Sequence, residues 1–116
     1  MDTLTRLQNW FDSQCDGEWE HHHGVSIETL DNPGWRVKID VNGTRLAGRA
    51  FSLVSKNVSQ GFIDQSMGKI KPPFVVASPL SNVWMVCFVK ENKFEGAGDA
   101  SQLDTLLSLF LDWAEK

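Results

Sequence analysis

The greatest density of reactive side chains lies in one short stretch of the sequence, residues 14–24. It holds a cysteine, three carboxylates, a tryptophan and three consecutive histidines. These residues are Cys15, Asp16, Glu18, Trp19, Glu20, His21, His22 and His23. Carboxylates, imidazoles and thiols bind metals or act as acids, bases and nucleophiles, so this stretch is the first candidate for a functional site.

The carboxylates of the stretch alternate with other residues, in the order Asp16, Gly17, Glu18, Trp19, Glu20. In an extended segment all three carboxylates would project from one side. Such an acidic patch would fit a basic protein surface, and this complementarity mainly raises association rate and selectivity. The alternative is a solvated loop in which Asp16 caps a helix and Glu18 pairs with a nearby lysine or arginine.

A metal site is a second interpretation of the stretch. Zinc ligands usually recur at spacings such as C-x₂₋₄-C or H-x₃₋₅-H, and the interval from Cys15 to His21 does not match them. In a strand only His21 and His23 would share a side. We therefore interpret the histidines as surface or hydrogen-bonding residues and expect no metal or other cofactor.

An enzyme would need a nucleophile and a base, or a carboxylate pair in a cleft. Cys15 with a neighbouring histidine, or Glu18 with Glu20, would supply such groups. The sequence has no P-loop, G-x-S-x-G or H-E-x-x-H motif that demands this interpretation. We expect a protein without catalytic activity. The alternative is a small enzyme or metal-binding protein that uses the region Cys15–His23.

Composition and charge restrict the possible partners. The 116 residues, 41% hydrophobic and 22% charged, predict one globular domain over 1–116. The net charge of -4 argues against a nucleic-acid partner and is compatible with a basic protein. No run approaches the roughly 20 apolar residues that span a bilayer, and the polar N-terminus lacks a signal-peptide core. We expect a cytoplasmic protein with no membrane partner.

Helices and strands must position the stretch. An amphipathic helix begins after Asp2 or Thr3, with apolar residues at Leu4, Leu7, Trp10 and Phe11. Gly17 suits the left-handed position that follows such a helix. Alternation then predicts strands over 25–29 and 35–41. A type II turn over 31–34 would join them, with Gly34 at positive φ.

The dipeptide Asn42-Gly43 predicts a type I′ hairpin. This turn would place Val41 opposite Thr44, with a β-bulge near 48–50 where the apolar phase slips. Residues 55–73 are interpreted as an irregular excursion with a short strand around Phe62-Ile63. A further short strand is predicted over 74–77.

Residues 83–89 are apolar on both faces, which is typical of a strand covered on both sides. One face should meet the helices, and the other needs cover from residues 55–80 or from a partner. The sequence is therefore compatible with a monomer and with a homodimer. The pair Gly96 and Gly98 predicts a tight turn into a last helix, with Asp99 as N-cap and Gln102 completing a capping box.

The last helix carries an apolar stripe at Leu103, Leu106, Leu107, Phe110 and Ala114. We assign Trp10, Trp35, Trp84 and Trp113 to the core, whereas Trp19 is either core or an exposed binding anchor. The order of elements predicts an α+β fold. It comprises an N-terminal helix, an antiparallel meander-like sheet, and a C-terminal helix packed on one face of the sheet.

Taken together, these residues resemble the immunity protein 53 family of bacterial polymorphic toxin systems. The most specific part runs from Gln14 to Trp35. Weaker matches are Leu7-x-x-Trp10-Phe11, Gly43-Thr44, Trp84-x-x-Cys87, Phe94-x-Gly96-x-Gly98 and 103–113. The resemblance covers nearly the whole chain, except residues 55–80.

The resemblance implies a cytoplasmic immunity protein that binds and neutralises a cognate toxin by occlusion, without catalysis. The expected partner is a toxin with a basic surface. The residues expected to contact it are Asp16, Glu18, Trp19, Glu20, His22 and Asp31.

Overall fold

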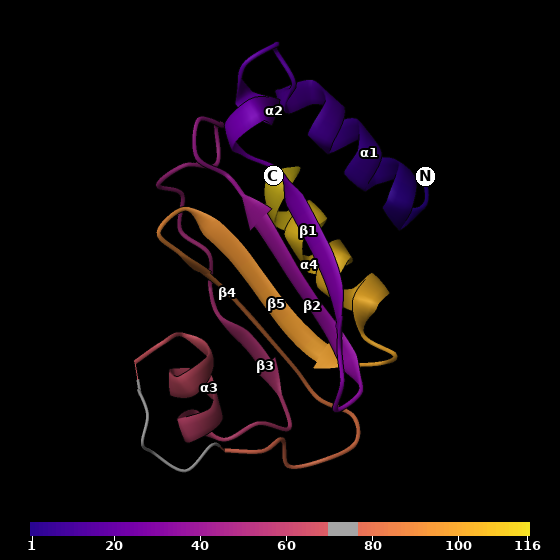
Figure 1. Cartoon of the computed structure of the whole chain (residues 1–116), viewed down its shortest axis with the longest axis vertical. Coiled ribbons are helices and arrows are strands. Elements are labelled where there is room, and N and C mark those ends of the chain that lie inside the picture. Colours follow the sequence, from indigo (N-terminus) through magenta and orange to yellow (C-terminus); the bar gives the residue numbers. More distant parts are fainter. Residues whose placement is uncertain (70–76) are drawn as a thin grey trace.

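The computed structural model describes residues 1–69 and 77–116 (Figure 1). The helices are α1 (Thr3–Gln14), α2 (Trp19–His22), α3 (Gln60–Ser66) and α4 (Leu103–Ala114). The strands are β1 (Val25–Leu30), β2 (Gly34–Asp40), β3 (Val54–Lys56), β4 (Met85–Lys90) and β5 (Lys93–Asp99). Within the described residues they form one antiparallel sheet in the order β1-β2-β5-β4-β3. This arrangement confirms the predicted α+β class, and residues 74–76 of one predicted strand lie outside the described residues.

The larger hydrophobic cluster fills the space between the sheet and the two long helices. The sheet contributes Val37 and Ile39 from β2, Cys87 from β4 and Phe94 from β5, and none of these side chains is exposed. The stripe of α4 covers them, as its spacing predicts, with Leu106, Leu107, Phe110 and Leu111 buried. α1 adds Leu7 to the same cluster, and its N-cap Asp2 accepts a hydrogen bond of 2.7 Å from Thr5 N.

The second cluster covers the other face of β4. Phe62 and Ile63 of α3 pack with Trp84, Val86 and Phe88. This confirms that residues 55–80 supply cover for the doubly apolar strand. The short strand predicted at Phe62-Ile63 is wrong, because Ser59 caps a helix there by accepting a hydrogen bond of 3.1 Å from Phe62 N.

The glycines before α4 serve close packing and do not form the predicted turn. Gly96 and Gly98 lie inside β5 beneath α4. A Cβ added at Gly96 would lie 3.0 Å from Leu106, and one at Gly98 would lie 2.7 Å from Gln102. Side chains at these positions would therefore separate the helix from the sheet.

The predicted N-cap at Asp99 is also wrong, because Asp99 is the last residue of β5 and Gln102 precedes α4. The Asp99 carboxylate instead accepts hydrogen bonds from Trp84 N at 2.8 Å and Ser101 N at 2.9 Å. Gln102 Nε2 also donates to it, at 3.0 Å. Asp99 thus joins the start of α4 to the start of β4.

The hairpin predicted at Asn42-Gly43 is wrong, and so is the β-bulge at 48–50. β2 already pairs with β1 on one side and β5 on the other, so a strand after Gly43 has no place beside it. Residues 41–49 form a series of turns instead. The two consecutive positive φ angles that a type I′ turn requires occur at Glu91 and Asn92, between β4 and β5.

The β1–β2 turn also differs from the prediction. The Asn32–Pro33 bond is cis and Gly34 does not have a positive φ, so the turn is not type II. Gly34 is required for another reason, because a Cβ there would collide with the backbone carbonyl of Gly98. Trp35 next to it is only partly buried, in contrast to the core position predicted for it.

Candidate functional site

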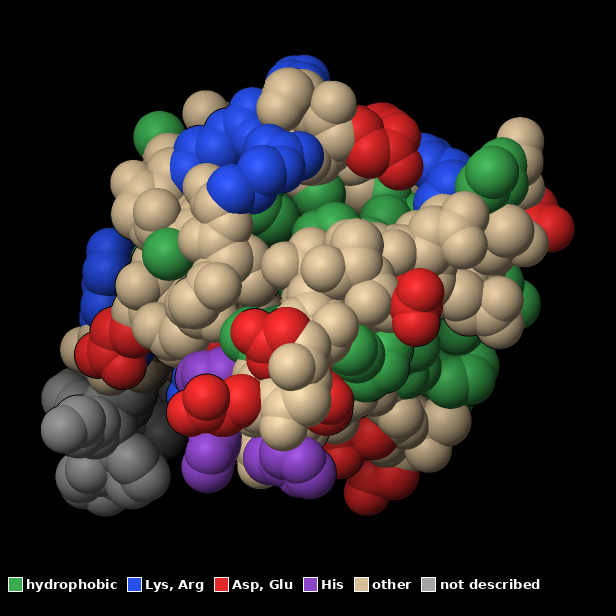
Figure 2. Space-filling model, turned by 90° about the horizontal axis from the view of Figure 1, so that it is seen from above, with side chains coloured by type: hydrophobic (Ala, Val, Ile, Leu, Met, Phe, Trp, Pro, Cys, Tyr) green, Lys and Arg blue, Asp and Glu red, His purple; other side chains and the backbone are tan. Residues whose placement is uncertain are grey.

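The chemically dense stretch lies at one end of the molecule, where α1 leads through α2 into β1 (Figure 1). The stretch is not extended. α1 ends at Gln14, a turn containing Gly17 at φ 92 follows, and α2 begins at Trp19. The expected one-sided row of three carboxylates is therefore wrong. Figure 2 shows acidic and histidine side chains gathered together at this end.

Two of the three carboxylates hold the backbone of this turn. Asp16 Oδ1 accepts hydrogen bonds of 2.9 Å from Glu18 N and Trp19 N. Glu20 accepts from Asp16 N at 3.0 Å and from Gly17 N at 2.9 Å. Together these reciprocal bonds resemble a capping box and hold the turn before α2, whose N-cap residue Glu18 makes no side-chain capping bond of its own.

These bonds favour the charged form of both carboxylates. The amides of Trp19 and then Glu18 lower the pKa of Asp16. The pKa of Glu20 is lowered first by its own amide, against some desolvation, and then by those of Asp16 and Gly17. Asp16 therefore has the capping role that the alternative interpretation gave it. The carboxylates of Asp16 and Glu20 both remain negatively charged near neutral pH.

Trp19 is a structural residue of the fold, with only 7% of its surface exposed. Its Nε1 donates a hydrogen bond of 2.8 Å to Asn42 O. Its ring meets those of Trp10 and Phe11 edge-on, at centroid distances of 6.1 and 6.0 Å. Trp19 therefore fixes α2 between α1 and the loop after β2, and is not an exposed anchor.

A polar network extends from the end of α2 across the sheet. His23 Nδ1 lies 2.7 Å from Asp40 Oδ2, and Asp40 Oδ1 accepts from Asn42 N at 2.9 Å. Asn92 Nδ2 then donates to Asn42 Oδ1 at 3.3 Å. Burial opposes ionisation of Asp40, but the bonds from His23 and Asn42 outweigh it and lower its pKa.

Sequence patterns missed the network residues Asp40, Asn42 and Asn92. The one available signal was Asn42, whose pairing with a glycine pointed to a turn. The turn exists, but its asparagine side chain bonds to Asp40 and Asn92 within the network.

The structure brings together five of the six residues expected to contact a partner. Glu18 and His22 are exposed, and they flank the buried Trp19 and the partly buried Glu20 at the start and end of α2. The sixth residue, Asp31, is exposed in the β1–β2 turn at the opposite end of β1 (Figure 1).

The two cysteines are poor nucleophiles in this fold. Desolvation raises the pKa of Cys15, and the nearby charges of Glu20, Asp12 and Asp16 add to the rise. Burial raises the pKa of Cys87 to about 12. Both thiols therefore stay protonated near neutral pH, and a thiolate is the reactive form.

Among residues 1–69 and 77–116, no group of three or more histidine, cysteine or carboxylate side chains is arranged to hold a metal ion. In the same part of the chain no helix is long and apolar enough to cross a bilayer.

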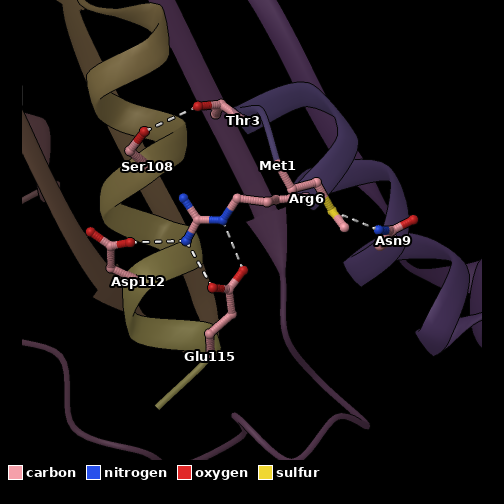
Figure 3. Close-up of polar contacts among 7 residues, drawn as sticks. All are labelled: Met1, Thr3, Arg6, Asn9, Ser108, Asp112 and Glu115. Carbon is pink, nitrogen blue, oxygen red and sulfur yellow. Dashed lines mark hydrogen bonds and ion pairs between the residues drawn. The ribbon is translucent and has the colours of Figure 1, made fainter.

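α1 carries the stretch and is fixed to α4 by a charged cluster (Figure 3). Arg6 Nη2 donates hydrogen bonds of 2.9 Å to Asp112 Oδ1 and Glu115 Oε1, and Arg6 Nε donates to Glu115 Oε2 at 3.0 Å. The hydroxyls of Thr3 and Ser108 lie 3.3 Å apart on the same pair of helices. The site is therefore positioned by the main core through α1.

Comparison with known proteins identifies a family. A family model described as Immunity protein 53 matches residues 4–115. No curated protein and no solved structure matches the chain significantly. Because the match spans α1 to α4 and includes the whole of the dense stretch, the chain belongs to the immunity protein 53 family.

Proposed function

We propose that this protein is an antitoxin that binds a cognate toxin of a polymorphic toxin system and neutralises it by occlusion, without catalysing a reaction. The observation that carries the proposal is the family match over residues 4–115. The proposed place of action is the bacterial cytoplasm, where residues 1–116 act as one binding domain.

The charge distribution supports a toxin with a basic surface. Between Leu7 and Trp35 the chain has six carboxylates and no lysine or arginine. They are Asp12, Asp16, Glu18, Glu20, Glu28 and Asp31. Three of them, Asp16, Glu18 and Glu20, lie together in the turn before α2 and in its first residues. Such a local excess of negative charge attracts an oppositely charged partner and accelerates its association.

The proposed contacts differ in the freedom of their side chains. Glu18 and His22 are exposed, and their side chains make no hydrogen bond within residues 1–69 and 77–116. Asp16 and Glu20 contribute charge while they hold the backbone of the turn. Trp19 contributes by fixing the position of α2 rather than by direct contact.

The first experiment is co-purification of this protein with the product of the neighbouring gene, at low and moderate salt. We expect a one-to-one complex, rescue of growth in cells that express the toxin, and weaker association at higher salt. If no neighbouring product binds and none is neutralised, the proposed function is wrong.

A charge-reversal pair then tests the acidic surface. Glu18→Lys should slow association with the toxin about tenfold at low salt, because long-range attraction falls. Asp64→Lys makes the same change of charge on α3 and should leave the rate nearly unchanged. Equal association rates for the two variants would show that the carboxylates around α2 do not attract the toxin.

A further inference from the structure

β1 is an edge strand of the sheet, and alternate backbone groups along it face away from β2. Asp40 N donates a hydrogen bond of 3.0 Å to Gly24 O, and the register pairs Val25 with Ile39. In an antiparallel ladder the bonded positions alternate. The N–H and C=O groups of Ser26 and Glu28 therefore face β2, and those of Val25, Ile27 and Thr29 face outward.

The same outward positions border an apolar groove. Val25 and Ile27 pair with Ile39 and Val37, so their side chains lie on the face of the sheet that α1 and α4 cover. A hollow between α1 and β1 is lined by Leu7, Gln8, Phe11 and Val25. Ile27 beside it is 39% exposed, and Phe11 is 36% exposed. Figure 2 shows hydrophobic side chains open to solvent beside carboxylates at this end of the molecule.

The charge around β1 indicates which chain would pair with it. The exposed Glu18 lies in the turn before α2, which leads into β1, Glu28 is within the strand and Asp31 follows it. Pairing β1 with a second copy of itself would bring two such acidic segments together, which is unfavourable. Glu28 itself lies opposite Arg36 of β2, so the attraction for a basic segment of another protein comes mainly from the two ends of the strand, at Glu18 and Asp31.

We propose that β1 accepts an extended segment of the toxin as an added antiparallel or parallel strand. Backbone hydrogen bonds form to Val25, Ile27 and Thr29, alternate apolar side chains of the segment enter the groove beside Phe11, and basic side chains meet the carboxylates. This inference rests on the proposed function and specifies the surface through which the toxin is bound.

A matched pair at Thr29 tests the backbone contact. Thr29→Pro removes an outward N–H and leaves the β1–β2 ladder intact, as proline does on edge strands. We expect it to raise the dissociation constant of the toxin complex about tenfold, as the loss of one or two hydrogen bonds predicts. Thr29→Ala, which keeps the N–H, should bind almost like the natural protein. Equal affinities of the two variants would overturn the inference.

A second pair tests the groove. Ile27→Lys places a positive charge where an apolar and basic segment would lie, and we expect about a hundredfold weaker binding. Val83→Lys makes the same change at a residue of similar exposure, 43%, before β4. It should bind the toxin normally, and equal effects of the two changes would contradict the groove as the docking site.

Amide hydrogen exchange provides a test that needs no variant. Upon toxin binding, protection should rise at Val25, Ile27 and Thr29, whereas Ser26 and Glu28 are already protected by β2. If the toxin binds and these three amides stay unprotected, the inference is wrong and the proposed function stands. If the same amides become protected without toxin as a dimer forms at high protein concentration, the occupant is a second copy instead. If the toxin does not bind the natural protein, the proposed function itself fails.

Discussion

The end of the molecule around α2 and the edge strand β1 are adjacent in the chain but differ in how they use their polar groups. The α2 end has the most reactive side chains, yet Asp16, Glu20 and His23 are bonded within the fold. β1 has an ordinary sequence, yet the backbone groups of three of its residues face outward, and no other strand within residues 1–69 and 77–116 pairs with them. The difference separates side chains that are already bonded within the fold from backbone groups that remain available for new hydrogen bonds.

The largest effect expected from this contrast is on stability. Trp19→Ala should lower the free energy of unfolding by about 3–5 kcal/mol, because it removes a buried ring and leaves a cavity. Ile27→Ala on the exposed edge should lower it by only about 1 kcal/mol. Urea denaturation measures both values. Similar losses for the two variants would remove the distinction between a structural end and an available edge.

A second prediction concerns the stability of the fold at low pH. The folded-state pKa values of Asp16, Glu20 and Asp40 are lowered, so folding favours their charged forms. Their stabilisation is fully present above the unfolded pKa of roughly 4 and is lost as the pH falls through the lower folded values. The free energy of unfolding, measured from about pH 6 to about pH 2, should show this loss. Glu20→Gln should reduce the slope of the free energy of unfolding against pH. An unchanged slope would count against the role of Glu20 in holding the turn before α2.

The smallest expected effect separates the carboxylates from each other. Asp16→Ala should lower the melting temperature by a few degrees, because the amides of Glu18 and Trp19 lose their acceptor. Glu18→Ala should leave the melting temperature nearly unchanged, since its side chain is exposed. Thermal unfolding monitored by circular dichroism gives the comparison, and a larger decrease for Glu18→Ala would reverse our assignment of roles.

Periodicity predicted the parts of the fold that depend on burial. The apolar stripe of α4 and the alternation of β2 each report one covered face, and both elements form where expected. The doubly apolar β4 indicated that its second face needs cover from residues 55–80 or from a partner, and α3 within that segment supplies it. These predictions succeed because burial of apolar area follows directly from side-chain type.

Turn signals failed where tertiary pairing decided the outcome. Asn42-Gly43 is a strong local hairpin signal, but β5 occupies the place beside β2 that the returning strand would need. Gly96 and Gly98 suggested a turn, whereas α4 requires them for close contact with β5. The extended backbone assumed for residues 16–20 gave the carboxylates the wrong directions. The alternative with a capping Asp16 anticipated the bonds of that residue, whereas those of Glu20 were missed.

The bonds between Arg6 and Glu115 join residues 109 positions apart in sequence. The β2–β5 ladder similarly pairs Gly34 with Asp99. Contacts between residues so far apart in sequence raise the contact order, and a higher contact order accompanies slower folding. During translation α1 and the β1–β2 hairpin must therefore wait for β5 and α4 before the main core can close. We therefore expect the chain to become able to fold only once β5 and α4 have been synthesised.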